Sequence, residues 1–110
     1  MSEKRKRIRA PLDVYLNKYV SGVPYMARAA DISTEGLSLA HLIEPDHERK
    51  RVGLQFQLPG SEEVIYAEGE IVREWLGAEE PEGSGVRFTL LTERHRRLID
   101  AYVARHTLDE

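Results

Sequence analysis

The 110-residue chain contains no cysteine, which excludes disulfides, thiolate catalysis and cysteine-based zinc sites. The absence also fits a reducing compartment, and we expect a cytoplasmic protein. No apolar run approaches the roughly 18 residues of a membrane span, and no apolar segment follows the basic N-terminus as it would in a secretory signal. With 41% hydrophobic and 32% charged residues, the composition is that of one small soluble domain.

Residue patterns typical of enzymes and metal sites are also missing. The four histidines, His41, His47, His95 and His106, lack the spacing of metal ligands. No serine lies in a nucleophile elbow, and the paired glutamates fall in expected loops, where they add solubilising charge. We therefore expect a binding protein without catalytic activity, metal or cofactor.

The charges are unevenly distributed, although the net charge is only -3. Residues 3–9 hold five basic side chains and one acid, whereas residues 62–82 hold eight glutamates and one arginine. An acidic body argues against a protein that coats nucleic acid. A basic segment on such a body favours a compact anionic ligand bound at one place.

Alternating apolar residues predict a mainly β protein. The segment 1–10 reads as a flexible basic arm, because a run of like charges repels itself. Strands are expected at 13–20, 25–30, around 37–39, at 52–58, at 64–75 with a bulge at Gly69, and at 86–90.

The pattern changes from period 2 to a helical period near the C-terminus. Thr92 is a plausible N-cap, and Leu98, Ile99, Tyr102 and Val103 recur on one helical face. Six or seven short strands followed by one amphipathic helix indicate a small antiparallel barrel with the helix packed beside it.

Arg5 and Arg9 form an R-x-x-x-R pair in the basic arm. With 12 arginines in the chain, chance supplies about one such pair. One interpretation is a solvated basic tail. The other is a phosphate clamp, because guanidinium groups bind phosphate oxygens in a bidentate fashion and can stack on a base.

The segment DISTEG, residues 31–36, contains a D-x-S-x-x-G motif that chance would supply only about 0.02 times. Asp31, Ser33 and Gly36 could simply form a turn, because Asp and Ser cap backbone amides and Gly tolerates a positive φ. Alternatively, Asp31 could accept hydrogen bonds from a base edge while Ser33 adds a hydroxyl. The carboxylate would suit the N1–H and 2-amino groups of guanine.

Together, the two motifs and the strands around them resemble the PilZ domain family. Arg9-Ala10-Pro11-Leu12 is similar to the family's approach to its first strand, and Gly36-Leu37-Ser38-Leu39 to its third strand. Glu70-Ile71-Val72-Arg73 and Gly85-Val86-Arg87-Phe88 are similar to later strands. The resemblance covers roughly residues 4–106.

The resemblance implies a six-stranded antiparallel β-barrel with a C-terminal α-helix over residues 11–106, and binding of cyclic di-GMP. By position, Arg5 and Arg9 would hold phosphates and guanines, Asp31 and Ser33 would read a guanine edge, and Gly36 would keep the turn open. Either Arg73 or Trp75 could add a contact. Arg28 and Arg87 are further cations that could be solvated or could face the ligand.

The expected function is a cyclic di-GMP receptor whose arm changes conformation on binding and thereby regulates a partner protein. Within bacteria, the family resemblance implies control of motility, adhesion or exopolysaccharide. A PilZ-fold interaction module that ignores the nucleotide is the alternative. A small-barrel nucleic-acid binder that uses the arm and the helix arginines is a third hypothesis, which the acidic 62–82 segment disfavours.

Overall fold

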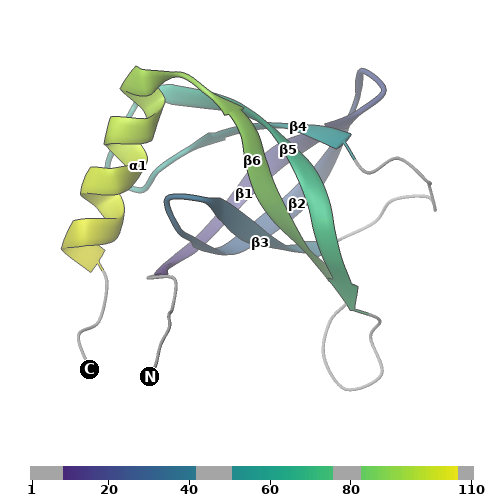
Figure 1. The fold of residues 1–110 in the computed structure, drawn as a ribbon, viewed down its shortest axis with the longest axis horizontal. Helices are drawn as coiled ribbons and strands as arrows, with labels where there is room; N and C mark the ends of the chain where they lie inside the picture. Colours follow the sequence, from purple (N-terminus) through teal and green to yellow (C-terminus); the bar gives the residue numbers. More distant parts are fainter. Residues whose placement is uncertain (1–8, 42–50, 76–82, 107–110) are drawn as a thin grey trace.

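Six strands and one helix make up the protein in a computed structural model that describes residues 9–41, 51–75 and 83–106 (Figure 1). All six strands and the helix agree with the elements predicted from the sequence. Their bounds are β1 (Ala10–Val20), β2 (Val23–Ile32), β3 (Gly36–His41), β4 (Arg51–Gln57), β5 (Val64–Trp75), β6 (Gly83–Leu91) and α1 (Glu93–His106).

The strands form a closed antiparallel barrel in the order β1-β2-β3-β6-β5-β4, which confirms the predicted fold class. Consecutive strands pair in β1–β2, β2–β3, β4–β5 and β5–β6, whereas closure requires β4 to pair with β1 and β3 to pair with β6. Strand β1 begins three residues before the predicted start, and β2 extends through Ile32. Asp31 therefore lies in a strand, and the turn begins after it.

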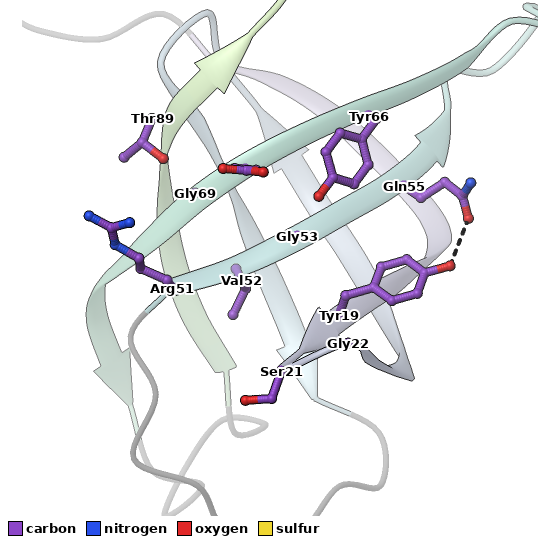
Figure 2. A pocket seen from close by; sticks show the side chains of 11 residues that line it. Tyr19, Ser21, Gly22, Arg51, Val52, Gly53, Gln55, Tyr66, Gly69 and Thr89 are labelled. Atoms are coloured by element: carbon purple, nitrogen blue, oxygen red, sulfur yellow. Dashed lines mark hydrogen bonds between the residues drawn. The ribbon is translucent and has the colours of Figure 1, made fainter.

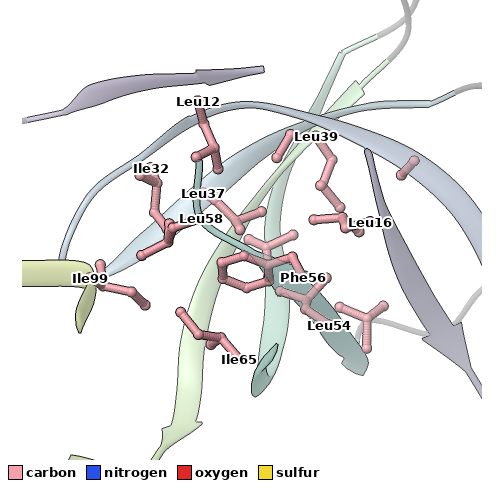
Figure 3. Packing of buried hydrophobic residues seen from close by; sticks show 14 of the residues in the cluster. Leu12, Leu16, Ile32, Leu37, Leu39, Leu54, Phe56, Leu58, Ile65 and Ile99 are labelled. Atoms are coloured by element: carbon pink, nitrogen blue, oxygen red, sulfur yellow. The ribbon is translucent and has the colours of Figure 1, made fainter. Parts of the chain in front are cut away.

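The barrel encloses the hydrophobic core. Alternate residues of each strand point inward, as the period-2 pattern predicts, and the helix adds three more buried side chains (Figure 3). Leu16, Leu37, Leu54 and Ile65 are each at most 4% exposed. Lys18 also occupies an inward position of β1 and is fully buried.

Helix α1 covers the end of the barrel at which β1, β3 and β5 begin (Figure 1). Thr92 caps it as predicted: its hydroxyl accepts a hydrogen bond from the His95 amide at 3.2 Å. Ile99 is fully buried and joins the core, which the predicted apolar face explains. In the described ranges, no helix has the length and hydropathy needed to cross a bilayer.

Polar contacts near both ends of α1 fix the helix to the barrel. Near its first turn, the Arg94 guanidinium donates two hydrogen bonds to the Glu63 carboxylate at 2.6 and 2.7 Å, and this lowers the pKa of Glu63. Near its last turn, the Tyr102 hydroxyl donates to the Pro11 carbonyl at 2.7 Å. The second tether holds the start of β1 against the helix.

The Tyr102 tether predicts a measurable loss of stability in the Tyr102→Phe variant. The substitution keeps the buried ring but removes the donor to Pro11, and one hydrogen bond contributes about 0.5–1.5 kcal/mol. Urea unfolding should show a free energy of unfolding that is lower by about that amount, with an unchanged m-value. Tyr15→Phe is the matched control, because the Tyr15 ring is 65% exposed. Equal midpoints for Tyr102→Phe and wild type would contradict the tether.

Candidate functional site

The candidate site is a cavity of about 340 Å³ on the outer surface of the barrel, where β3 pairs with β6. Residues on both sides of this pairing line it, together with Arg9 from the start of the described chain. The lining comprises Arg9, Asp31, Ser33, Glu35, Gly36, Ser38, Val72, Arg73, Gly85, Val86 and Arg87. The cavity thus brings together five of the seven sequence-predicted residues: Arg9, Asp31, Ser33, Gly36 and Arg73.

Two β-bulges direct side chains of this cavity outward. The register of β2 against β3 shifts between Ala29 and Asp31, so Asp31 is partly exposed although regular alternation from Ala29 would turn it inward. In β5 the register against β6 shifts between Ile71 and Arg73, and Arg73 is exposed instead of buried like Ile71. Each bulge therefore brings one charged group to the surface.

Arg9 and Asp31 form an ion pair at the edge of the cavity. The guanidinium Nη1 lies 2.5 Å from the Asp31 Oδ1, and the two side chains are 38% and 33% exposed. A pair this exposed contributes only about 0–1 kcal/mol to stability. Both partners can therefore be redirected to a ligand at small cost.

Ser33 has a local structural role. Its side chain is buried, and its hydroxyl accepts the Glu35 amide hydrogen at 3.1 Å. The Ser33 amide donates to the Gly36 carbonyl at 2.8 Å, which closes the turn between β2 and β3. The geometry agrees with the turn-forming interpretation of the motif. The predicted contact of Ser33 with a guanine remains a prediction.

Gly36 does not have the conformation that the turn-forming interpretation expects. Its φ is not positive, so it does not serve as a left-handed turn residue. Instead, a Cβ atom at this position would lie 2.0 Å from the Val86 carbonyl oxygen. Glycine is required here because the backbones of β3 and β6 approach closely beneath the cavity.

Three guanidinium groups surround the cavity, from Arg9, Arg73 and Arg87. The Arg87 Nη2 lies 2.6 Å from the Glu70 carboxylate, and its side chain remains half exposed. Arg87 was one of several candidate cations in the sequence. Arg87 differs from the other candidate cations because it pairs with Gly36 across β3 and β6. This pairing can be assigned only from the order of the strands in the barrel.

Other lining residues carried no signal of their own in the sequence. Glu35 precedes Gly36 directly, Ser38 follows it two positions later on the same face of β3, and Gly85 pairs with Ser38. The remaining predicted residues lie outside the described part of the structure: all of Arg5, and the side chain of Trp75 at the end of β5.

A family model for the PilZ domain matches residues 3–105. The chain belongs to the PilZ family. The match spans both predicted motifs and every strand of the barrel. It confirms the resemblance drawn from R-x-x-x-R, D-x-S-x-x-G and the strands that follow.

Solved structures share the fold of this PilZ domain. The Bacillus subtilis inhibitor of motility, MotI or DgrA, has a TM-score of 0.80 at 14% identity, over 94% of this chain and 51% of that chain. The PilZ domain of Escherichia coli YcgR with c-di-GMP has a TM-score of 0.70 at 13% identity, over 94% and 92%. Borreliella burgdorferi PlzA in complex with c-di-GMP has a TM-score of 0.65 at 14% identity, over 91% and 41%.

These low identities make the comparison one of fold. This PilZ domain spans about half of the MotI chain and less than half of the PlzA chain. The sequence has no match among curated proteins.

The close approach at Gly36 predicts that Gly36→Ala destabilises this PilZ domain. The added methyl group would push β3 away from β6. Overpacking of this kind lowers the free energy of unfolding by about 1–3 kcal/mol. Gly85→Ala is the matched control on the facing strand, because its Cβ would meet nothing closer than the Arg73 Cβ at 3.7 Å. Thermal unfolding should show a lower Tm for Gly36→Ala alone. Two equal decreases would contradict the assigned role of Gly36.

Proposed function

We propose that this PilZ domain is a non-enzymatic receptor for cyclic di-GMP that binds the nucleotide in the cavity beside β3 and β6. The observation that carries the proposal is the convergence of three arginines and Asp31 on one cavity in a domain of this family. The fold neighbours YcgR and PlzA were solved with c-di-GMP. We further propose that the receptor acts in the cytoplasm, without a metal or a cofactor.

The charges of the cavity suit the ligand. Cyclic di-GMP carries two phosphates, and Arg9, Arg73 and Arg87 present planar sets of donors to such oxygens. Asp31 adds a group that phosphate binding does not need, a carboxylate that accepts hydrogen bonds. Guanine offers it the N1–H and 2-amino donors, whereas adenine offers no such pair.

Ligand binding would exchange partners at the Arg9–Asp31 ion pair. The guanine edge would replace Arg9 at the Asp31 carboxylate, and the guanidinium would turn to a phosphate or stack on the base. The exposed ion pair contributes at most about 1 kcal/mol. A hydrogen bond to a charged group contributes about 1.5–3 kcal/mol, so the exchange is favourable. Arg5, in the same motif, would supply a second clamp.

The output would begin at the start of β1. We propose that the segment 1–10 changes conformation when Arg9 engages the ligand, and that this change regulates a partner protein. Pro11 lies two residues after Arg9, and its carbonyl accepts the Tyr102 hydroxyl of α1. A shift at Arg9 would therefore act close to the tether that holds α1. Motility is one candidate process, since the neighbour MotI is an inhibitor of motility.

Calorimetry with cyclic di-GMP tests the proposed site. Arg9→Ala should weaken binding by about tenfold or more, because it removes at least one charge-assisted hydrogen bond. Arg28→Ala is the matched control: Arg28 also pairs with an aspartate, Asp13, and is 40% exposed, but it does not line the cavity. Its affinity should equal that of the wild type.

Two results would overturn the proposal. Equal affinity of wild type and Arg9→Ala would remove Arg9 from the mechanism. Lack of binding by the folded wild-type protein would favour the alternative, an interaction module of PilZ fold that does not bind the nucleotide.

The role of Asp31 predicts base selectivity. Wild type should prefer cyclic di-GMP to cyclic di-AMP, because only guanine donates two hydrogen bonds to the carboxylate. Asp31→Asn should reduce this preference by about tenfold, since one lost hydrogen bond to a charged group corresponds to roughly 1.5 kcal/mol. Competition titrations with both nucleotides measure the ratio. An unchanged ratio in Asp31→Asn would show that another residue reads the base.

A further inference from the structure

Glu70 lies between two arginines on the outer surface of the barrel. In the pairing of β4 with β5, Arg51 is opposite Glu70, and in the pairing of β5 with β6, Arg87 is opposite Glu70. Directly opposed side chains on neighbouring strands have Cβ atoms about 4.5–5.5 Å apart, and opposite charges in such pairs attract each other. The Glu70 carboxylate can therefore pair with a guanidinium on either side.

The two arginines belong to different cavities. Arg87 lines the candidate nucleotide cavity, whereas Arg51 lines a second cavity of about 530 Å³. Figure 2 shows the Arg51 side chain at the edge of this second cavity, where it extends from β4 toward β5. Because Glu70 pairs between Arg51 and Arg87, it lies at the boundary of the two cavities.

Glu70 holds only one of these arginines. The Arg87 Nη2 donates a hydrogen bond to the Glu70 Oε1 at 2.6 Å, and the two side chains are 53% and 43% exposed. Within the described residues, Arg51 has no ion-pair partner. An ion pair between side chains this exposed is weak. Glu70 can therefore leave Arg87 at small cost, and Arg51 can accept it.

Cyclic di-GMP would bring a second anion to Arg87. A phosphate oxygen accepts the same guanidinium hydrogens as the Glu70 carboxylate. If both anions stayed on Arg87, they would lie within a few ångströms of each other, and like charges at that distance repel more strongly at a protein surface than in bulk water. Turning Glu70 toward Arg51 removes this repulsion and gives the carboxylate a new partner.

The alternative is that Glu70 orients Arg87 for the ligand. Two parallel hydrogen bonds fix a guanidinium against a carboxylate, as they do between Arg94 and Glu63. Between the described side chains of Arg87 and Glu70 there is one hydrogen bond, through a single Nη atom. One such bond leaves the guanidinium able to turn. The geometry therefore favours competition over orientation.

We propose that Glu70 sets the affinity of the nucleotide cavity, because it competes with the ligand phosphate for Arg87 and moves to Arg51 when the ligand binds. This inference rests on the proposed function, since it requires that Arg87 binds a phosphate of cyclic di-GMP. The competing acid lowers the affinity below the value that the arginines of the cavity would give alone. The domain would then release the nucleotide at concentrations at which a more cationic cavity would remain filled.

Calorimetry with cyclic di-GMP on Glu70→Gln tests the competition. The substitution keeps the shape of the side chain and removes its charge, so the variant should bind about fivefold more tightly than the wild type. Glu68→Gln is the matched control. It makes the same change in net charge on the same strand, but Glu68 is opposite Gly53 and Leu90 instead of arginines. Its affinity should equal that of the wild type.

A double-mutant cycle tests the movement to Arg51. Arg51→Ala should weaken binding by about twofold to threefold, although Arg51 does not line the nucleotide cavity, because Glu70 loses its second partner. In the Glu70→Gln background, Arg51→Ala should leave the affinity unchanged. An equal loss in both backgrounds would overturn the movement to Arg51.

The outcomes separate this inference from the proposed function. If the wild type binds cyclic di-GMP and Glu70→Gln binds with equal or lower affinity, Glu70 does not compete with the ligand, and the proposed receptor function still stands. If the folded wild-type protein does not bind cyclic di-GMP, the proposed function is wrong, and the role of Glu70 falls with it. Equal gains in Glu70→Gln and Glu68→Gln would show a general effect of net charge and would also overturn the inference.

Discussion

The pairing of β3 with β6, which helps to close the barrel, requires glycine at position 36. The backbone carbonyl of Val86 occupies the space in which any other residue would place its Cβ. This pairing joins segments that are about 50 residues apart in the sequence, so it carries a large loop-closure cost that the closed core must offset. The same pairing forms the floor of the candidate nucleotide cavity. One steric constraint therefore supports both the closed fold and the site.

Irregularities in the strands then determine what the cavity contains. Regular alternation would turn Asp31 and Arg73 toward the core, where an ionised group is costly. The bulges at these positions reverse their direction and bring an acid and a base to the same surface. Arg9 completes the set because it lies immediately before β1, opposite the end of β2. Site chemistry in this domain thus depends on departures from the pattern that builds the barrel.

Local signals in the sequence were sufficient for most of the fold. Residues 52–58 and 64–75 alternate clearly, and Thr92 followed by apolar residues at helical spacing predicts α1. The bulge at Gly69 was also predicted, and the register of β5 does shift beside it. These features depend on neighbours in the chain. They can therefore be predicted from a single sequence.

Features that depend on pairing across the barrel could not be predicted in the same way. Asp31 interrupts the alternation of β2, so the strand seemed to end before it. The role of Gly36 depends on Val86 and not on its own φ. The proximity of Arg87 depends on the closure of the barrel. The burial of Lys18 could not be predicted either. Its inward direction follows from the alternation of β1, but its side chain is enclosed by the other strands.

Any effect of Arg9 on the rest of the barrel must pass first through β1, because this strand begins directly after Arg9. Asp13 lies within β1, at the register shift between β1 and β2, and has a φ of 56°. A non-glycine residue in that region is held there by its surroundings, and Asp13 also forms an ion pair with Arg28. A change in how Arg9 is held would thus reach Asp13 before it reached the rest of β1.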